Sequence, residues 1–165
     1  MAQKQNIVEK LVGWIPGYKG YADKEARRDT DRLLREATVR LLEEPKRSID
    51  RAIALCSQSM KFDSLESLEA LRRRLATVSD RIRHAPQGYG GFFDTMKIDA
   101  AVLADIHDHD ERLRELATAV GTAARGLESV DESSSVASAS KTVQQSIEAV
   151  ETHLRRRDEL LKGAE

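Results

Sequence analysis

Four long stretches of this sequence repeat apolar residues at alternating spacings of three and four, the period of one face of an α-helix. The clearest row lies between residues 64 and 84: Leu68, Leu71, Leu75, Val78 and Ile82. No stretch alternates polar and apolar residues as a half-buried strand does. A chain with four such rows must bury four helix faces against one another. This pattern predicts an all-α, antiparallel four-helix-type bundle.

The remaining rows extend the same prediction over the rest of the chain. A long helix from residue 23 to about 60 is expected to bury Leu33, Leu34, Ala37, Leu41, Leu42, Ile49, Ile53, Cys56 and Met60. A helix ending near Leu127 is expected to bury Val102, Ile106, His109, Leu113, Leu116 and Val120. The last helix follows the serine-rich stretch 129–140, predicted to be a loop, and buries Val143, Ile147, Val150, Leu154 and Leu161. Three long helices and this last one make the bundle.

Local signals refine the ends of these helices. Pro45 lies inside the first long helix, where it removes a backbone hydrogen bond, so a kink or short break is expected there. Asp63 and Glu66 have the spacing of a capping box and predict the start of the next helix. Residues 3–13 are expected to form a short N-terminal amphipathic helix. We therefore expect one domain overall, with residues 1–22 preceding the bundle of residues 23–165.

Composition limits the function. The chain of 165 residues is 33% charged and has a formal net charge of −1, which gives no global attraction for nucleic acid. The arginine triplets 72–74 and 155–157 do not form a stripe on a helix and are expected on solvated faces. The single cysteine permits no internal disulfide, and no run approaches the ~18 apolar residues of a membrane span. A cytoplasmic location is expected.

Aromatic residues are confined almost entirely to two short stretches, GWIPGYKGY (13–21) and APQGYGGFFD (85–94). Together these stretches hold six of the seven aromatic residues, six of the nine glycines and two of the three prolines. If the helices run back and forth, both stretches lie at the same end of the bundle. Two interpretations follow: the rings form a plug that closes this end, or some stay exposed for recognition. The predicted partner-binding residues are Trp14, Tyr18, Tyr21, Tyr89, Phe92 and Phe93.

The two motifs PGYKGY and RIRHAPQGYGGFFD also resemble uncharacterised bacterial helical proteins that carry a PGY-x-GY element and a GFFD element. The resemblance covers about a fifth of the chain. It implies a bacterial, cytosolic setting, and it brings no catalytic residue with it.

One stretch invites a metal interpretation. In DIHDHDE (105–111), His109 occupies a position in the apolar row and lies one helical turn from Asp105, whereas His107 is expected in solvent. A bundle metal site needs further inward carboxylates and histidines, and no matching Glu-x-x-His appears on another helix. A histidine paired with Asp105 is therefore favoured over a metal ligand. Cys56 is expected to be a small buried residue and not a nucleophile.

These observations lead to one leading function and two alternatives. The leading one is a non-enzymatic interaction protein, an adaptor or assembly subunit, that binds a protein partner or itself through the aromatic stretches. A metal- or small-molecule-binding bundle around His109 is the first alternative. A peripheral membrane-surface protein that uses the helix at residues 3–13 is the second. We expect no catalytic residue, no metal or other cofactor, and no nucleic-acid partner.

Overall fold

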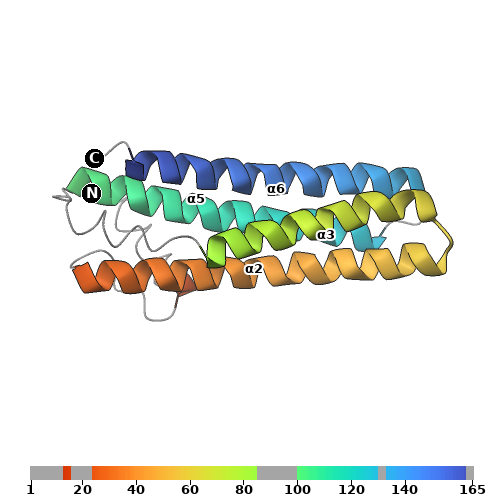
Figure 1. Cartoon of the computed structure of the whole chain (residues 1–165), viewed down its shortest axis with the longest axis horizontal. Helices are drawn as coiled ribbons and strands as arrows, with labels where there is room; N and C mark the ends of the chain where they lie inside the picture. Colours follow the sequence, from red (N-terminus) through yellow and green to blue (C-terminus); the bar gives the residue numbers. More distant parts are fainter. Residues whose placement is uncertain (1–12, 16–23, 85–99, 130–132, 163–165) are drawn as a thin grey trace.

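The computed structural model describes residues 13–15, 24–84, 100–129 and 133–162. These residues form helices and no strand: α2 (Lys24–Gln58), α3 (Phe62–Arg83), α5 (Ala100–Arg125), the short 3-10 helix η1 (Gly126–Ser129) and α6 (Ser133–Lys162). α2 packs against α3 and α5, and α6 packs against α5 and α3 (Figure 1). The predicted all-helical class and the packing of four long helices are confirmed for the described part of the chain.

The core follows the predicted rows closely in α3 and in the middle of α6. All five residues of the α3 row are at most 5% exposed. In α6, Val143, Ile147 and Val150 are fully buried. Burying such side chains is worth roughly 1.5–3 kcal/mol each, so these two rows contribute a large part of the stabilisation of the bundle. In α5 the predicted Leu113 and Val120 are buried, whereas Asp110 and Ala117 are buried in place of their predicted neighbours His109 and Leu116. Ala124 continues this row.

α2 continues through Pro45 without a break. Pro45 is buried and faces Gly121 of α5, whose missing Cβ would lie 3.9 Å from the proline Cδ. One turn further along, the Ser48 hydroxyl and the Arg51 guanidinium both donate hydrogen bonds to the Glu128 carboxylate. These contacts attach α5 and η1 to the centre of α2.

The α2–α3 link differs from the prediction in two respects. The predicted capping box is wrong, because α3 begins at Phe62 and its N-cap, Lys61, makes no side-chain capping bond. Asp63 lies instead in the first turn of the helix, where a negative charge is favourable. Met60, predicted to be buried in the α2 row, is 77% exposed because α2 ends at Gln58.

The prediction for the serine-rich stretch is also wrong. Residues 129–140 were expected to form a loop, but α6 begins at Ser133, so residues 133–140 are helical. The physical reason is burial: Val136 and Ser140 are at most 5% exposed and continue the apolar row that Val143 leads. Packing of this face outweighs the weak helix preference of serine.

α3 is much shorter than α2, with 22 residues against 35. Its last residue, Arg83, lies 3.9 Å from Glu43 of α2 in an ion pair. The residues of α2 before about position 40 therefore extend past the end of α3 (Figure 1). This stretch of α2 carries the first candidate site.

Candidate functional site

Trp14 is the one predicted partner-binding residue that lies within the described part of the chain. It is half-buried and, with Leu33, packs against a small cluster formed by Ile15, Leu34 and Ala37. This cluster is separate from the main core. The other five predicted residues, Tyr18, Tyr21, Tyr89, Phe92 and Phe93, lie outside the described residues. Trp14 therefore packs with Ile15 against the side of α2 and remains partly accessible.

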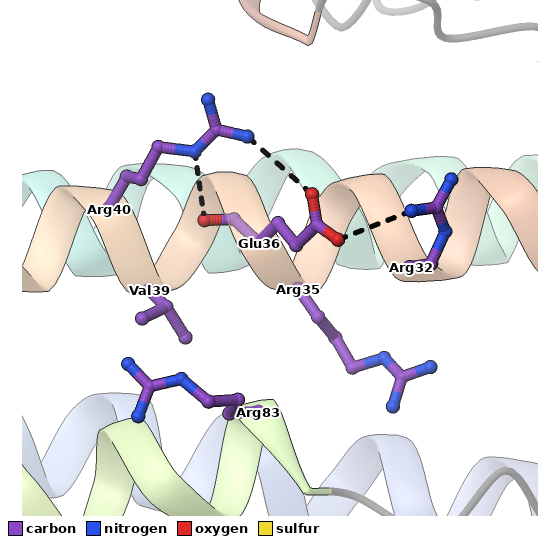
Figure 2. A pocket seen from close by; sticks show the side chains of 6 residues that line it. All are labelled: Arg32, Arg35, Glu36, Val39, Arg40 and Arg83. Carbon is purple, nitrogen blue, oxygen red and sulfur yellow. Dashed lines mark hydrogen bonds and ion pairs between the residues drawn. The ribbon is translucent and has the colours of Figure 1, made fainter.

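An arginine-lined hollow of about 450 Å³ lies on the same stretch of α2 (Figure 2). Its lining residues are Arg32, Arg35, Glu36, Val39, Arg40 and Arg83. We call it the arginine hollow. Figure 2 shows Glu36 between Arg32 and Arg40, with Arg35 and Arg83 reaching from α2 and α3. Glu36 forms ion pairs with Arg32 at 3.5 Å and with Arg40 at 3.7 Å.

Sequence reasoning missed the arginine hollow. On α2, its residues occur at positions 32, 35, 36, 39 and 40, which is the spacing of one helix face. That signal was present, but α2 alone does not create the hollow. Arg83 completes the hollow because α3 ends at this level, and no local sequence motif indicates where α3 ends relative to α2.

The DIHDHDE stretch of α5 is arranged differently from the metal interpretation. His109 is half-buried and stacks on His153 of α6, with ring centroids 3.6 Å apart and planes 22° apart. The His153 Nε2–H donates a hydrogen bond to the His109 carbonyl oxygen at 2.9 Å. Asp105 is exposed. Among the described residues, no group of three or more potential ligands could hold a metal ion.

The buried acids of this stretch were not anticipated. Asp110 is fully buried and Glu111 is 7% exposed, with Glu111 accepting two hydrogen bonds from Arg114 at 2.7 and 2.8 Å. His107, expected in solvent, is half-buried, and burial lowers its pKa from the ordinary value of 6.5. This histidine is therefore neutral in the folded protein at neutral pH.

A second hollow, of about 710 Å³, lies between the start of α3 and the first half of α6. It is lined by Asp63, Ser64, Ser67, Ala137, Ser140, Lys141, Gln144, Gln145 and Glu148. We call it the polar groove. It exists because small side chains face each other across the two helices. The Ser140 hydroxyl is buried there, with no hydrogen-bond partner among the residues that the structure describes.

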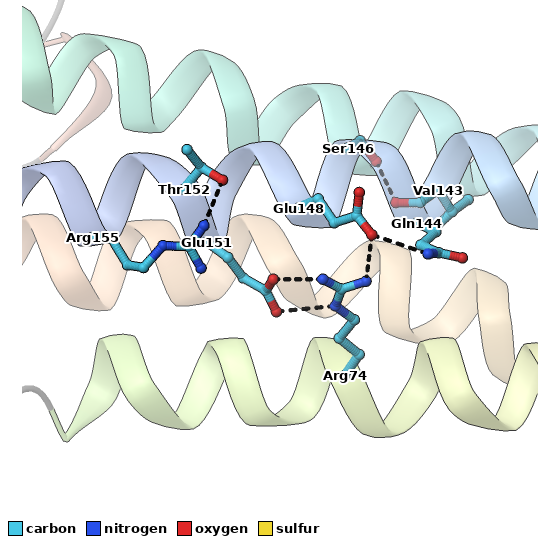
Figure 3. Close-up of polar contacts among 8 residues, drawn as sticks. All are labelled: Arg74, Val143, Gln144, Ser146, Glu148, Glu151, Thr152 and Arg155. Carbon is cyan, nitrogen blue, oxygen red and sulfur yellow. Dashed lines mark hydrogen bonds and ion pairs between the residues drawn. The ribbon is translucent and has the colours of Figure 1, made fainter.

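Arg74 of α3 binds Glu148, one of the residues that line the polar groove (Figure 3). Its guanidinium donates two hydrogen bonds to Glu151, at 3.1 and 2.7 Å, and one to Glu148 at 2.8 Å. These bonds, those with Glu151 first, raise the pKa of Arg74 further above its usual range. Hydrogen bonds from Gln144 and then Arg74 lower the pKa of Glu148. Arg74 thus joins α3 to α6 instead of pointing into solvent as expected.

The comparisons with known proteins add no further assignment. No protein-family model matches the chain, and neither does any curated protein or solved structure. Within the described ranges, no helix carries a stretch long and apolar enough to cross a bilayer. The described residues therefore define the class: a four-helix bundle, with the arginine hollow and the polar groove at different levels along its length.

Proposed function

We propose that this chain is a non-enzymatic interaction protein, an adaptor or assembly subunit, that docks through its glycine- and aromatic-rich stretches. The observation that carries the proposal is the half-buried Trp14 on a stretch of α2 that also carries the arginine hollow. Tryptophan and arginine are the residue types richest in the energetic centres of protein interfaces. A partly exposed side chain that already packs on its own fold needs little ordering when a partner binds.

The proposal includes a site shared by the two aromatic stretches. Trp14 packs at residues 33–37 of α2, and the end of α3 contacts Glu43. These two levels are six residues apart, or about 9 Å along a helix. The chain therefore leaves α3 close to where Trp14 is fixed, which supports a site that combines Trp14 with Phe92 or Phe93.

The finer architecture also belongs to the proposal. We take the bundle to be antiparallel between helices that follow one another in the chain. For α2 and α3 this is supported by the order of their ion pairs, because Glu43 pairs with Arg83 whereas Asp50 pairs with Arg72. Two further parts of the proposal are the amphipathic helix at residues 3–13 and a bend of α2 at Pro45.

A binding experiment tests the docking site. The tagged wild-type chain is used to recover partners from a bacterial lysate, in parallel with a Trp14→Ala, Phe92→Ala double variant and with Arg40→Ala. Arg156→Ala, which alters an exposed arginine of α6 that does not line the hollow, is the matched control. We expect a protein that is recovered with the wild type and the control and lost with the other two. Equal recovery by all four chains would refute the proposed site.

A further inference from the structure

Three large hydrophobic side chains are exposed within eight residues around the α2–α3 link. Leu55 is 52% exposed, Met60 is 77% exposed and Phe62 is 65% exposed. They are the large hydrophobic residues that stand out as exposed in the described part of the chain. We call Met60 and Phe62, with Leu55 behind them, the apolar tip. Single exposed apolar residues are ordinary, whereas a group at one protruding point of a fold marks a contact surface.

The backbone of Met60 strengthens this interpretation. Its φ is 54°, the left-handed region that glycine adopts without cost. The Met60 amide donates to the Ser57 carbonyl at 3.2 Å, and the Lys61 amide donates to the Cys56 carbonyl at 2.9 Å. This is the Schellman pattern that ends many helices, and its left-handed position is usually glycine. A strained methionine that contributes little to the core is explained by a role for its side chain outside the monomer.

The polar groove begins immediately beside the apolar tip. Asp63 and Ser64, which follow Phe62, line its near end, and α6 forms the opposite wall. Ser64 and Ser140 are each 5% exposed, and the buried Ser140 hydroxyl has no hydrogen-bond partner among the described residues. A buried hydroxyl in that state is costly unless something supplies the missing bond. A protruding point and a hollow with an unsatisfied hydroxyl therefore lie next to each other.

We propose that the polar groove receives the apolar tip of a second copy of this chain, so that two copies form a two-fold symmetric dimer. In such a dimer each tip enters the other copy's groove, because one patch contains both parts. The proposal deepens the proposed function, on which it rests, by naming the chain itself as one partner. It concerns a surface distinct from the one around Trp14.

Area and charge both favour this occupant. Two tips touching end to end would bury only a few side chains, far below the roughly 800 Å² per partner of a stable interface. Seating each tip between α3 and α6 adds the walls of two grooves. Charges of both signs also lie at the contact: Lys61 and Lys141 are positive, and Asp63 and Glu148 are negative. A lysine of one copy can therefore face a carboxylate of the other.

The net negative charge of the segment around the apolar tip disfavours an anionic membrane as the occupant. Between residues 52 and 71 the chain carries Lys61 against Asp63, Glu66 and Glu69. Segments that bind anionic lipid surfaces are rich in lysine and arginine instead.

Sedimentation equilibrium over a wide concentration range tests the proposal. We expect the wild type to be a monomer–dimer mixture. Phe62→Ser on the tip and Ala137→Glu in the groove should each weaken dimerisation roughly tenfold or more, since each residue acts twice in a two-fold interface. Ala119→Glu is the matched control, because Ala119 is also an exposed alanine on a long helix but lies on α5. Circular dichroism establishes that each variant is folded.

Disulfide trapping tests the geometry directly. Phe62→Cys protein is mixed with Ala137→Cys protein under mild oxidation, and the native Cys56 is buried and therefore protected. Cross-linked heterodimer should form from this mixture and not from Phe62→Cys mixed with Ala119→Cys. A wild type that stays monomeric at every concentration, or a dimer that survives both interface substitutions, overturns the proposal. Neither result affects the lysate experiment on Trp14, so the two proposals fail separately.

Discussion

Replacing Met60 by glycine should make the protein more stable, although a side chain is removed. The left-handed conformation at φ 54° costs an ordinary residue roughly 1–2 kcal/mol, and glycine is exempt from this cost. Glycine in turn loses about 0.5–1 kcal/mol through the greater freedom of the unfolded chain. The net gain relative to alanine at the same position is about 0.5–1 kcal/mol. For a chain of this length, that corresponds to roughly 1–4 °C in the melting temperature.

Met60→Ala is the appropriate reference because it removes the methionine side chain and keeps the strained backbone. With 77% of Met60 exposed, truncation to alanine alone should change the stability only slightly. Urea denaturation followed by circular dichroism, at two protein concentrations, separates monomer stability from any effect of dimerisation. If Met60→Gly is no more stable than Met60→Ala, the backbone at this position carries no strain. The argument that methionine is kept there for its side chain would then fail.

Three further expectations concern the body of the bundle. Gly121→Ala should raise the free energy of unfolding by about 0.5–1 kcal/mol in thermal denaturation, because alanine favours a helix over glycine and the added Cβ would lie at ordinary contact distance from Pro45. A lower melting temperature would show that the helices cannot accommodate the Cβ. Arg74→Met should lower the free energy of unfolding by roughly 0.5–2 kcal/mol, because it removes the two hydrogen bonds to Glu151. If added salt does not reduce this difference in stability between wild type and variant, the cause is not electrostatic. Burial lowers the pKa of His107, so as the pH falls the unfolded chain takes up a proton near pH 6.5, before the folded protein does, and the free energy of unfolding should decrease below that pH. His107→Gln should make this pH dependence shallower, and an unchanged slope would refute the prediction.

The parts of the fold that could be predicted are those decided by local periodicity. In α3 every residue of the predicted row is buried, because a single helix face packs along its whole length. Two positions of α5 show the limit of this reasoning. His109 and Leu116 keep the three-four spacing with Leu113 and Val120, but Asp110 and Ala117 keep it equally well and are the ones buried. Choosing between them requires knowledge of the neighbouring helices.

The serine-rich start of α6 shows a different limit, because its composition favours a loop whereas its periodicity favours a helix. Val136 lies seven residues before Val143, two helical turns on the same face. That spacing indicated a helix through the serines, and the alanines at positions 137 and 139 favour one as well. Short polar side chains on the exposed face of a helix are compatible with burial of the opposite face.

The two hollows could not be predicted from any segment alone. The arginine hollow depends on where α3 stops relative to α2, and the polar groove depends on which small residues of α3 and α6 meet. The apolar tip could not be predicted for a related reason. Phe62 is the one aromatic residue outside the two rich stretches, and its exposure follows from the position of the link and not from its composition.

The positions of the two proposed contact surfaces along α2 have a consequence for how they work together. Trp14 packs at residues 33–37, and α2 ends 21 residues later at Gln58, which places the apolar tip about 30 Å away along the helix. Surfaces this far apart on one rigid bundle do not compete for space, so self-association and partner docking should be additive. Phe62→Ser should therefore abolish the dimer while leaving recovery of the docked partner unchanged. Trp14→Ala should abolish recovery of the docked partner while leaving the dimer unchanged. Loss of both activities from either substitution would mean that the two surfaces are coupled through the fold, and the assignment of separate roles would have to be abandoned.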